Sequence, residues 1–167
     1  RREAFERLGL YGRVPGAPLL ILGERGTGKT RLIETVVSAA KGKQVVSVAC
    51  GGVDPNLAES TLFGHVRGAF TGADKERAGL IAAAKGKILF LDEVQDLPRT
   101  VQRKLVRVLQ DRQRRYSPVG SDEERRSDFD VVCASNRSLS ELQGLLDADL
   151  FDRSIDNQVS RLRKKVE

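Results

Sequence analysis

A short run, residues 23–30, has the residue types and spacing needed to hold a phosphate group. The run consists of Gly23, Glu24, Arg25, Gly26, Thr27, Gly28, Lys29 and Thr30, in the pattern G-x-x-x-x-G-K-[ST]. Its glycines let backbone N–H groups turn toward phosphate oxygens, and a helix that follows would present its positive end to the same anion. Lys29 would reach the β- and γ-phosphates, and the Thr30 hydroxyl would ligate Mg²⁺. The apolar run before this motif and the helix-like run after it favour a P-loop over a glycine-rich turn that binds nothing.

Two carboxylates, Asp92 and Glu93, directly follow the apolar run of residues 88–91. If that run is a strand of a parallel sheet, the acids lie at its carboxyl edge, where ligands bind. Asp92 would then hold the Mg²⁺ shell and Glu93 would polarise the attacking water, as hydrolysis of a nucleoside triphosphate requires. An acidic pair after a strand is also a common helix cap. The P-loop elsewhere in the chain favours the catalytic interpretation.

A third polar position, Asn136, follows the apolar run of residues 131–134. It should emerge at the same edge of the sheet, near the γ-phosphate. It is equally well placed to cap the next helix, and the pattern alone leaves both roles open.

The segments that position these residues alternate between apolar runs and helix-like runs. Short apolar runs typical of buried parallel strands cover residues 19–22, 45–49, 88–91 and 131–134. Helix-like stretches cover residues 30–40, 78–84, 100–110 and 139–146. This alternation predicts an α/β fold of three layers, a parallel sheet with helices on both faces. Residues 64–74 and 117–128 do not fit simple crossovers, so we expect two loops that project from the core.

Composition limits the class of protein. The chain of 167 residues fits a single domain. It has no apolar run near the ~18 residues of a membrane span, and its charged first residues do not resemble a secretory signal, so we expect a cytoplasmic protein without membrane contact. Cys50 and Cys133 lie in β-branched apolar runs and are expected to be buried free thiols rather than a disulfide or metal site. The net charge of +6 permits nucleic-acid contact, although a solvated basic surface is the simpler explanation.

Residues 60–73 resemble the signature of the bacterial enhancer-binding proteins, the AAA+ ATPases that activate sigma-54 RNA polymerase. The hexapeptide of that signature is complete in Gly68, Ala69, Phe70, Thr71, Gly72 and Ala73. The resemblance extends through residues 89–93, 102–110 and 134–137 and covers roughly residues 15–153.

The resemblance implies an AAA+ ATPase core that uses ATP and Mg²⁺ and remodels sigma-54 RNA polymerase. It implies that the hexapeptide tips a loop that contacts the sigma-54 factor, and that residues 112–128 form a second loop beside it. Asp92 and Glu93 match the Walker B pair and Asn136 matches sensor I. Arg153 matches an arginine finger, which reaches the ATP of the neighbouring subunit in a homo-oligomeric ring. The catalytic set implied is therefore Lys29, Glu93, Asn136 and Arg153.

The chain departs from the family at two positions within the core. Asp147 stands where the family has its first finger arginine, and Ala49 stands where it has an asparagine that restrains the catalytic glutamate. The first change is expected to weaken hydrolysis that depends on a neighbouring subunit. The second is expected to weaken the coupling between hydrolysis and target binding.

A third departure follows Arg153, where the family continues into a fifth strand, a helical lid and often a DNA-binding domain. Here Ile155, Val159, Leu162 and Val166 have helical spacing within a basic segment, similar to a recognition helix of response-regulator output domains. We therefore expect an incomplete AAA+ core in residues 1–153 without its lid, a basic amphipathic helix in residues 154–167, and DNA contacts only through domains absent here. The first strand should lie at an exposed sheet edge, and nucleotide should bind weakly and be hydrolysed slowly.

Two other functions stay open. The chain could be a non-catalytic module that binds nucleotide or sigma factor without efficient turnover, as Asp147 and Ala49 suggest. It could also bind duplex DNA through the basic residues 161–165, which predicts a salt-dependent affinity.

Overall fold

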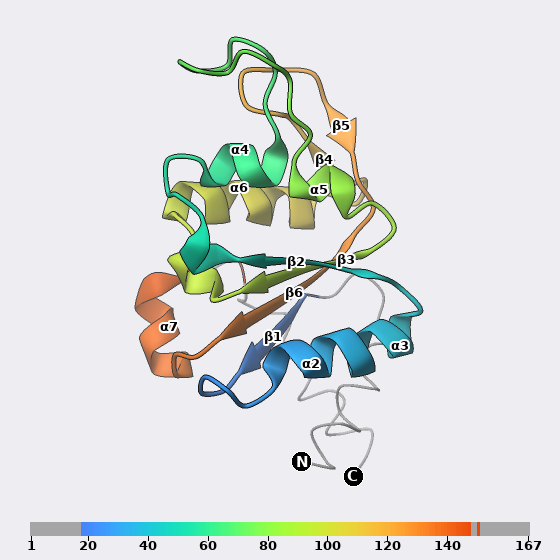
Figure 1. The fold of residues 1–167 in the computed structure, drawn as a ribbon, viewed down its shortest axis with the longest axis vertical. Helices are drawn as coiled ribbons and strands as arrows, with labels where there is room; N and C mark the ends of the chain where they lie inside the picture. The colour runs from blue at the N-terminus through green and yellow to red at the C-terminus, as the bar shows by residue number, and fades with distance from the viewer. Residues whose placement is uncertain (1–17, 148–149, 151–167) are drawn as a thin grey trace.

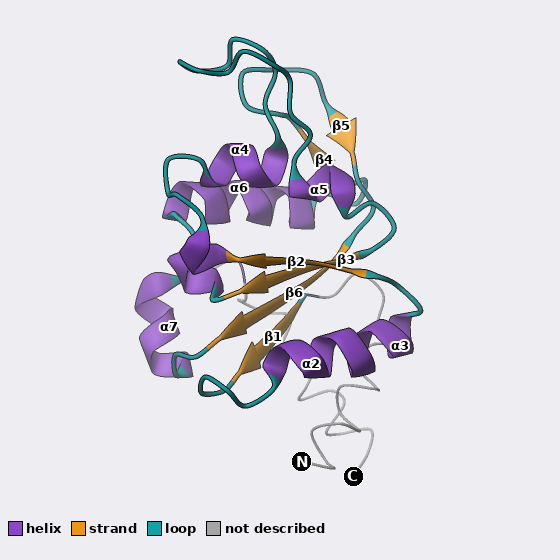
Figure 2. Ribbon diagram, viewed as in Figure 1, coloured by secondary structure: helices purple, strands orange, loops and turns teal. Residues whose placement is uncertain are grey.

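The computed structural model describes residues 18–147 and 150 of the chain (Figure 1). Its main sheet contains four parallel strands in the order β1-β6-β3-β2. Their bounds are β1 (Leu19–Leu22), β2 (Val45–Ala49), β3 (Ile88–Asp92) and β6 (Asp130–Ser135). All four predicted strands are confirmed. Strand β3 extends one residue further than predicted, to Asp92, and β6 extends one residue further at each end, to Asp130 and Ser135. The strand arrows all end on the same side of the molecule, so the sheet has one common carboxyl edge (Figure 2).

Helices cover both faces of this sheet, which confirms the predicted three-layer α/β fold (Figures 1 and 2). One face carries α4 (Ala58–Phe63), α5 (Leu80–Ala83) and α6 (Arg99–Gln110). The other carries α2 (Lys29–Leu32) and α3 (Ser38–Lys41), which are joined by a π-helical turn at Ile33–Val37. Helix α7 (Leu139–Leu145) follows β6 at the carboxyl edge.

The central strand β3 explains why the apolar runs lack the alternation of a half-exposed strand. Leu89 and Leu91 pack into the core formed with α4 to α6, whereas Ile88 and Phe90 pack with α2 and its π-helical turn on the other face. All four side chains are at most 1% exposed. Both faces of the strand must therefore be apolar, and each buried side chain contributes about 1.5 to 3 kcal/mol.

The helical predictions differ from the structure in three places. The helix predicted at 30–40 is present but contains the π-helical turn, where the Thr35 hydroxyl donates to the carbonyl of Arg31 at 2.6 Å and competes with regular helix bonding. Helix α5 begins two residues later than predicted because Arg77 pairs with His65 through backbone bonds of 2.9 and 3.0 Å. Helix α4 was not predicted, because its six residues are too few to show a helical periodicity in the sequence.

The second projecting loop is also more ordered than its polar sequence suggests. Its two arms pair as short antiparallel strands, β4 (Arg115–Tyr116) and β5 (Arg125–Arg126). A two-residue strand leaves no recognisable alternation in the sequence, so only the loop itself was predictable.

The edge position predicted for the first strand is confirmed within the described residues, where β1 pairs with β6 alone. Leu22 at its end is 40% exposed. The predicted helix at 154–167 and Arg153 lie outside the described residues, so the division at residue 153 remains a prediction. No helix in residues 18–147 and 150 is long and apolar enough to cross a bilayer.

Gln102 is a fully buried polar residue that joins α6 to the chain on either side of it. Its Nε2 donates to the carbonyls of Leu97 at 2.8 Å and Leu145 at 3.2 Å, and its Oε1 accepts from the backbone N–H of Asp147 at 2.7 Å. One side chain thereby fixes the turn after β3 and the end of α7.

Replacing Gln102 with leucine should therefore lower the free energy of unfolding by about 2 kcal/mol, because one buried and two partly buried hydrogen bonds to the backbone are lost. Urea denaturation measures this change. Gln110→Leu, at an exposed position of the same helix, is the matched control and should stay within about 0.5 kcal/mol of the parent. Equal midpoints for the two variants would contradict the assignment.

Candidate functional site

The P-loop begins where β1 ends and is anchored to the neighbouring strand. The backbone N–H of Gly23 donates to the carbonyl of Ser135 in β6 at 3.2 Å. Gly26 and Gly28 have φ angles of 76° and 81°, and a Cβ at either position would meet no atom within 4 Å. Glycine adopts this left-handed conformation without strain. Such a conformation turns successive N–H groups toward one concave surface. Lys29 Nζ donates back to the carbonyls of Gly23 and Glu24, the latter at 2.8 Å, so the lysine is held within the loop.

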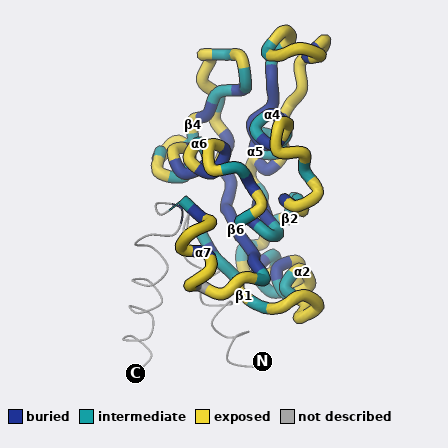
Figure 3. Tube along the Cα trace, turned by 90° about the vertical axis from the view of Figure 1, so that its left-hand side faces the viewer, coloured by how far each residue is buried: buried dark blue, intermediate teal, exposed yellow. Residues whose placement is uncertain are grey.

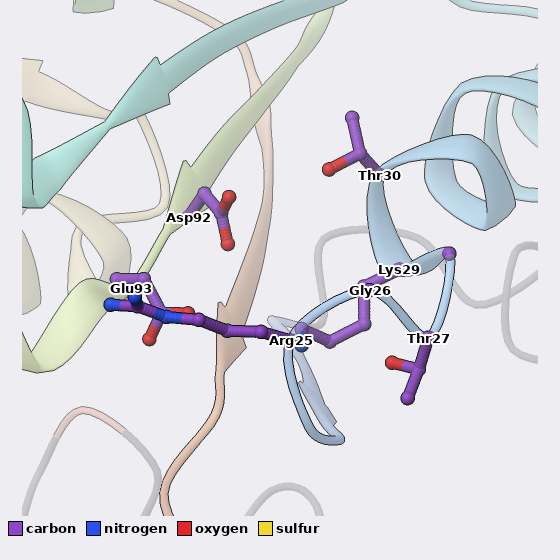
Figure 4. Close-up of a pocket in the computed structure, with 8 residues that line it drawn as sticks. Arg25, Gly26, Thr27, Lys29, Thr30, Asp92 and Glu93 are labelled. Carbon is purple, nitrogen blue, oxygen red and sulfur yellow. The ribbon is translucent and has the colours of Figure 1, made fainter.

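The P-loop and the end of β3 line one cavity of about 480 Å³ (Figure 4). The residues around it are Arg25, Gly26, Thr27, Gly28, Lys29, Thr30, Asp92 and Glu93. The two motifs predicted from separate parts of the sequence thus meet in space. In the close-up, the Thr30 hydroxyl and the Asp92 carboxylate point toward one another, and the Arg25 side chain extends across the cavity toward Glu93.

The oxygens of Thr30 and Asp92 form a donor set suited to Mg²⁺, which prefers hydroxyl, carboxylate and phosphate oxygens. The positive ammonium of Lys29 and the open backbone of Gly26 and Gly28 suit an anion beside it. The residues present therefore fit a magnesium-bound nucleoside triphosphate.

Glu93 occupies an unusual backbone conformation at the end of β3. Its φ of 53° lies in the left-handed region, where a residue with a side chain carries strain of about 1 to 3 kcal/mol. It precedes a 3-10 turn at Val94–Asp96 but makes no side-chain bond that caps it, so the capping alternative is wrong. Its Oε2 instead accepts from Gln95 Nε2 at 2.8 Å and from the backbone N–H of Asn136 at 3.1 Å.

Asn136 therefore lies beside the Glu93 carboxylate rather than at a helix terminus. The cap of α7 is Ser138, whose hydroxyl accepts from the N–H of Glu141 while the Glu141 carboxylate accepts from the N–H of Ser138. The capping alternative for Asn136 is wrong. Among the described residues, those that line the cavity do not include Asn136, which contacts the site through Glu93.

The hexapeptide forms a closed turn at the tip of the first loop, residues 64–74. Gly68 donates to the carbonyl of Ala73 at 2.8 Å, and Ala73 donates to that of Phe70 at 3.0 Å. The ring of Phe70 meets the ring of His65 edge-on at 4.9 Å between centroids but stays 37% exposed. His65 is itself held at the loop base by a 2.5 Å contact between its Nδ1 and the Ser60 hydroxyl. Most of this loop is exposed at one end of the molecule (Figure 3).

The second loop, residues 117–128, lies against the first (Figure 1). Val119 donates to the carbonyl of Gly64 at 2.9 Å and accepts from the N–H of Val66 at 3.2 Å. A Cβ added to Gly120 would come within 2.6 Å of the Ala69 Cβ. Arg125 bonds to Glu76, on the returning arm of the first loop, at 2.7 Å. The two loops therefore form one joined projection.

The two departures within the core have definite surroundings. The Asp147 carboxylate pairs with Arg103 Nε of α6 at 3.3 Å, so this acid is engaged inside its own chain. Ala49 lies opposite Asp92 in the register of β2 and β3, one position before Glu93. Its methyl group has no polar atom with which to hold that carboxylate.

Gln95 and Ser135 are site residues that the sequence analysis did not single out. Gln95 contacts Glu93, as above, and Ser135 Oγ donates to Gln95 Oε1 at 2.7 Å. The only sequence signal for them is a polar side chain close behind the acidic pair and another directly before Asn136.

Comparisons with known proteins agree with this geometry. The chain matches the model of the Sigma-54 interaction domain over residues 4–159. It is 46% identical over 140 residues to the nitric oxide reductase transcription regulator NorR1 of Cupriavidus necator, a match covering 81% of this chain and 27% of that protein. It is 43% identical over 139 residues to the regulatory protein LuxO of Vibrio cholerae, covering 81% and 26%. The chain therefore spans only about a quarter of the length of these relatives.

Two solved structures with similar folds are described by their nucleotide or by an NTPase domain. The structure of NtrX from Brucella abortus in complex with ATP has a TM-score of 0.74 and 26% identity, and the match covers 91% of this chain and 33% of that one. The P-loop NTPase domain of a sigma-54 transport activator from E. coli has a TM-score of 0.58 at 19% identity, covering 90% and 85%. The second likeness concerns the fold alone.

The two cysteines are buried free thiols, as predicted. Burial, assisted by the negative charges of Asp96 and Asp92, raises the pKa of Cys50 to about 12. Burial also raises the pKa of Cys133.

Neither thiol should therefore react with Ellman's reagent in the folded protein at pH 8. With a pKa near 12, only about one Cys50 molecule in ten thousand is thiolate at that pH, and the thiolate is the reactive form. Absorbance of the released thiolate measures the reaction. Both cysteines should react at once in 6 M guanidinium chloride, whereas rapid reaction of native protein would contradict the burial of Cys50.

Proposed function

The chain belongs to the sigma-54 interaction domain family, and we propose that it is the ATP-binding and ATP-hydrolysing core of a sigma-54-dependent transcription activator. The observation that carries the proposal is the single cavity that brings the P-loop together with Asp92 and Glu93. Phosphate-binding backbone, a cation, Mg²⁺ ligands and a candidate base are the groups that phosphoryl transfer to water requires.

Each part of the cavity has its own task in this proposal. The P-loop N–H groups and Lys29 bind the phosphates, and Lys29 exchanges its carbonyl partners for phosphate oxygens when nucleotide enters. Thr30 and Asp92 would hold Mg²⁺, which would neutralise charge on the phosphate oxygens. Glu93 orients the attacking water and accepts its proton, and Asn136 supports Glu93 through its backbone N–H.

The joined projection of the two loops is the proposed contact with the sigma-54 factor and its RNA polymerase. The half-exposed ring of Phe70, flanked by small residues, has the character of an anchor for a protein partner. The active form is proposed to be a homo-oligomeric ring in the cytoplasm, in which Arg153 reaches the ATP of the neighbouring subunit. DNA contacts would come from other domains of a longer protein.

A non-catalytic module that binds nucleotide or sigma factor is the second candidate. It is favoured by Asp147, because a carboxylate cannot supply the positive charge of an arginine finger. Here that carboxylate pairs with Arg103 of its own chain. It is favoured also by Ala49, which cannot restrain Glu93.

Two single substitutions should separate hydrolysis from partner contact. Lys29→Ala should lower ATP turnover at least ~100-fold, because a charged group that stabilises the transferring phosphoryl is lost. Thr71→Ala should keep turnover and abolish sigma-54-dependent transcription, because Thr71 lies in the exposed hexapeptide. Phosphate release and in vitro transcription measure the two activities.

Thr100→Ala, at an exposed position of α6, is the matched control and should retain both activities. Full transcription by the Thr71 variant would show that the loop assignment is wrong.

The dependence of turnover on protein concentration should distinguish the two candidate functions. If a ring forms and arginine fingers act across it, the rate per subunit should rise steeply with concentration. A non-catalytic module should stay near the background rate at every concentration while still binding a fluorescent ATP analogue. A rapid rate per subunit that does not vary with concentration would count against both candidates.

A further inference from the structure

Gln95 connects the carboxylate of Glu93 to the end of β6. Its Nε2 donates to Glu93 Oε2 at 2.8 Å and lies 3.5 Å from Asn136 Oδ1. Its Oε1 accepts from the hydroxyl of Ser135, a residue with no exposed surface, at 2.7 Å. One amide group therefore bridges strands β3 and β6 at the carboxyl edge of the sheet.

The chemistry of its neighbours fixes the orientation of this amide. An ionised carboxylate can only accept hydrogen bonds, so the NH₂ end of Gln95 must face Glu93. The Ser135 hydroxyl already accepts from the backbone N–H of Arg137 at 3.1 Å, and its own hydrogen is thus available for Gln95 Oε1. The chain of bonds from Arg137 through Ser135 and Gln95 to Glu93 is consistent in direction, and a flipped amide would break it at both ends.

Among residues 18–147 and 150, the hydrogen bonds to the Glu93 carboxylate come from Gln95 and Asn136 and none comes from β2. The neighbouring strand β2 ends in Ala49, which pairs with Asp92 and carries only a methyl group. Glu93 itself has a strained backbone with a φ of 53°. A strained residue keeps one conformation only when its surroundings determine it, and in the part of the chain that the structure describes Gln95 is the side chain hydrogen-bonded to the Glu93 carboxylate.

We propose that Gln95 is the positioning residue for Glu93, holding its carboxylate against β6 so that Oε1 is the oxygen that accepts the proton from the attacking water. The inference rests on the proposed ATP hydrolysis. Both bonds from the described residues fall on Oε2, which fixes the plane of the carboxylate. The same bridge ties Glu93 to Ser135, whose carbonyl accepts from Gly23, so the base and the start of the P-loop share one support.

Gln95→Ala should lower kcat about 10- to 100-fold with KM for ATP unchanged, because a misplaced base slows chemistry while the P-loop still binds phosphate. Gln95→Glu keeps the length and shape of the side chain, but its ionised carboxylate cannot donate to Glu93. It also places a second negative charge beside that carboxylate. This variant should therefore be at least as slow as the alanine variant. Steady-state phosphate release gives kcat and KM, and Gln44→Ala, at an exposed position before β2, is the matched control.

The glutamate variant also separates positioning from packing. If Gln95 acted only by filling space, Gln95→Glu would retain near-normal kcat while Gln95→Ala lost it, and that result would overturn the proposal. So would an equal loss of nucleotide binding in both variants, measured with a fluorescent ATP analogue.

A second readout works without turnover. In ¹⁵N-labelled protein, Glu93→Ala should move the side-chain amide resonance of Gln95 and leave that of Gln44 in place. If the parent chain binds nucleotide but does not hydrolyse it, the proposed function fails while a shifted Gln95 resonance still supports the bridge. An unmoved Gln95 resonance would overturn the bridge whatever the turnover.

Discussion

Parallel hydrogen bonding among β1, β6 and β3 is the constraint on which the site depends. The register pairs Leu22 with Ser135 and Asp92 with Ala134, so the ends of the three strands lie side by side. The P-loop leaves the first end, Asn136 follows the second and Glu93 follows the third. A shift of register by one residue would turn each of these side chains to the other face of the sheet. The observed register of these strands therefore sets the relative positions of the candidate site residues.

The parts predictable from sequence are those encoded in consecutive residues. The P-loop, the four strands and the exposed hexapeptide each depend on a local pattern, and their meeting at one edge follows from the rule that parallel strands share a carboxyl end. Gln95 was not predictable, because its role depends on partners such as Ser135 that are 40 positions away. Whether Glu93 and Asn136 cap helices or belong to the site likewise depends on the three-dimensional structure. The turn after β3 is capped by no side chain, and Ser138 takes the capping role in α7.

The departures from the family pattern become less disruptive once their surroundings are known. Ala49 has no polar group, yet the Glu93 carboxylate is held by Gln95 and by the backbone N–H of Asn136, which directly follows β6. The backbone N–H of Asp147 donates to Gln102, and its carboxylate pairs with Arg103. Asp147 therefore stabilises the junction between α6 and α7.

The backbone pairing of Val119 with Gly64 and Val66 has a mechanical meaning for the projecting loops. Two loops that are hydrogen-bonded to each other should bend less easily than a single loop that is anchored only at its two ends. Force applied at Phe70 would pass down both stems in parallel, into α4 and α5 on one side and into β4 and β5 on the other. The stiffness of the tip then depends on the close approach of Gly120 to Ala69.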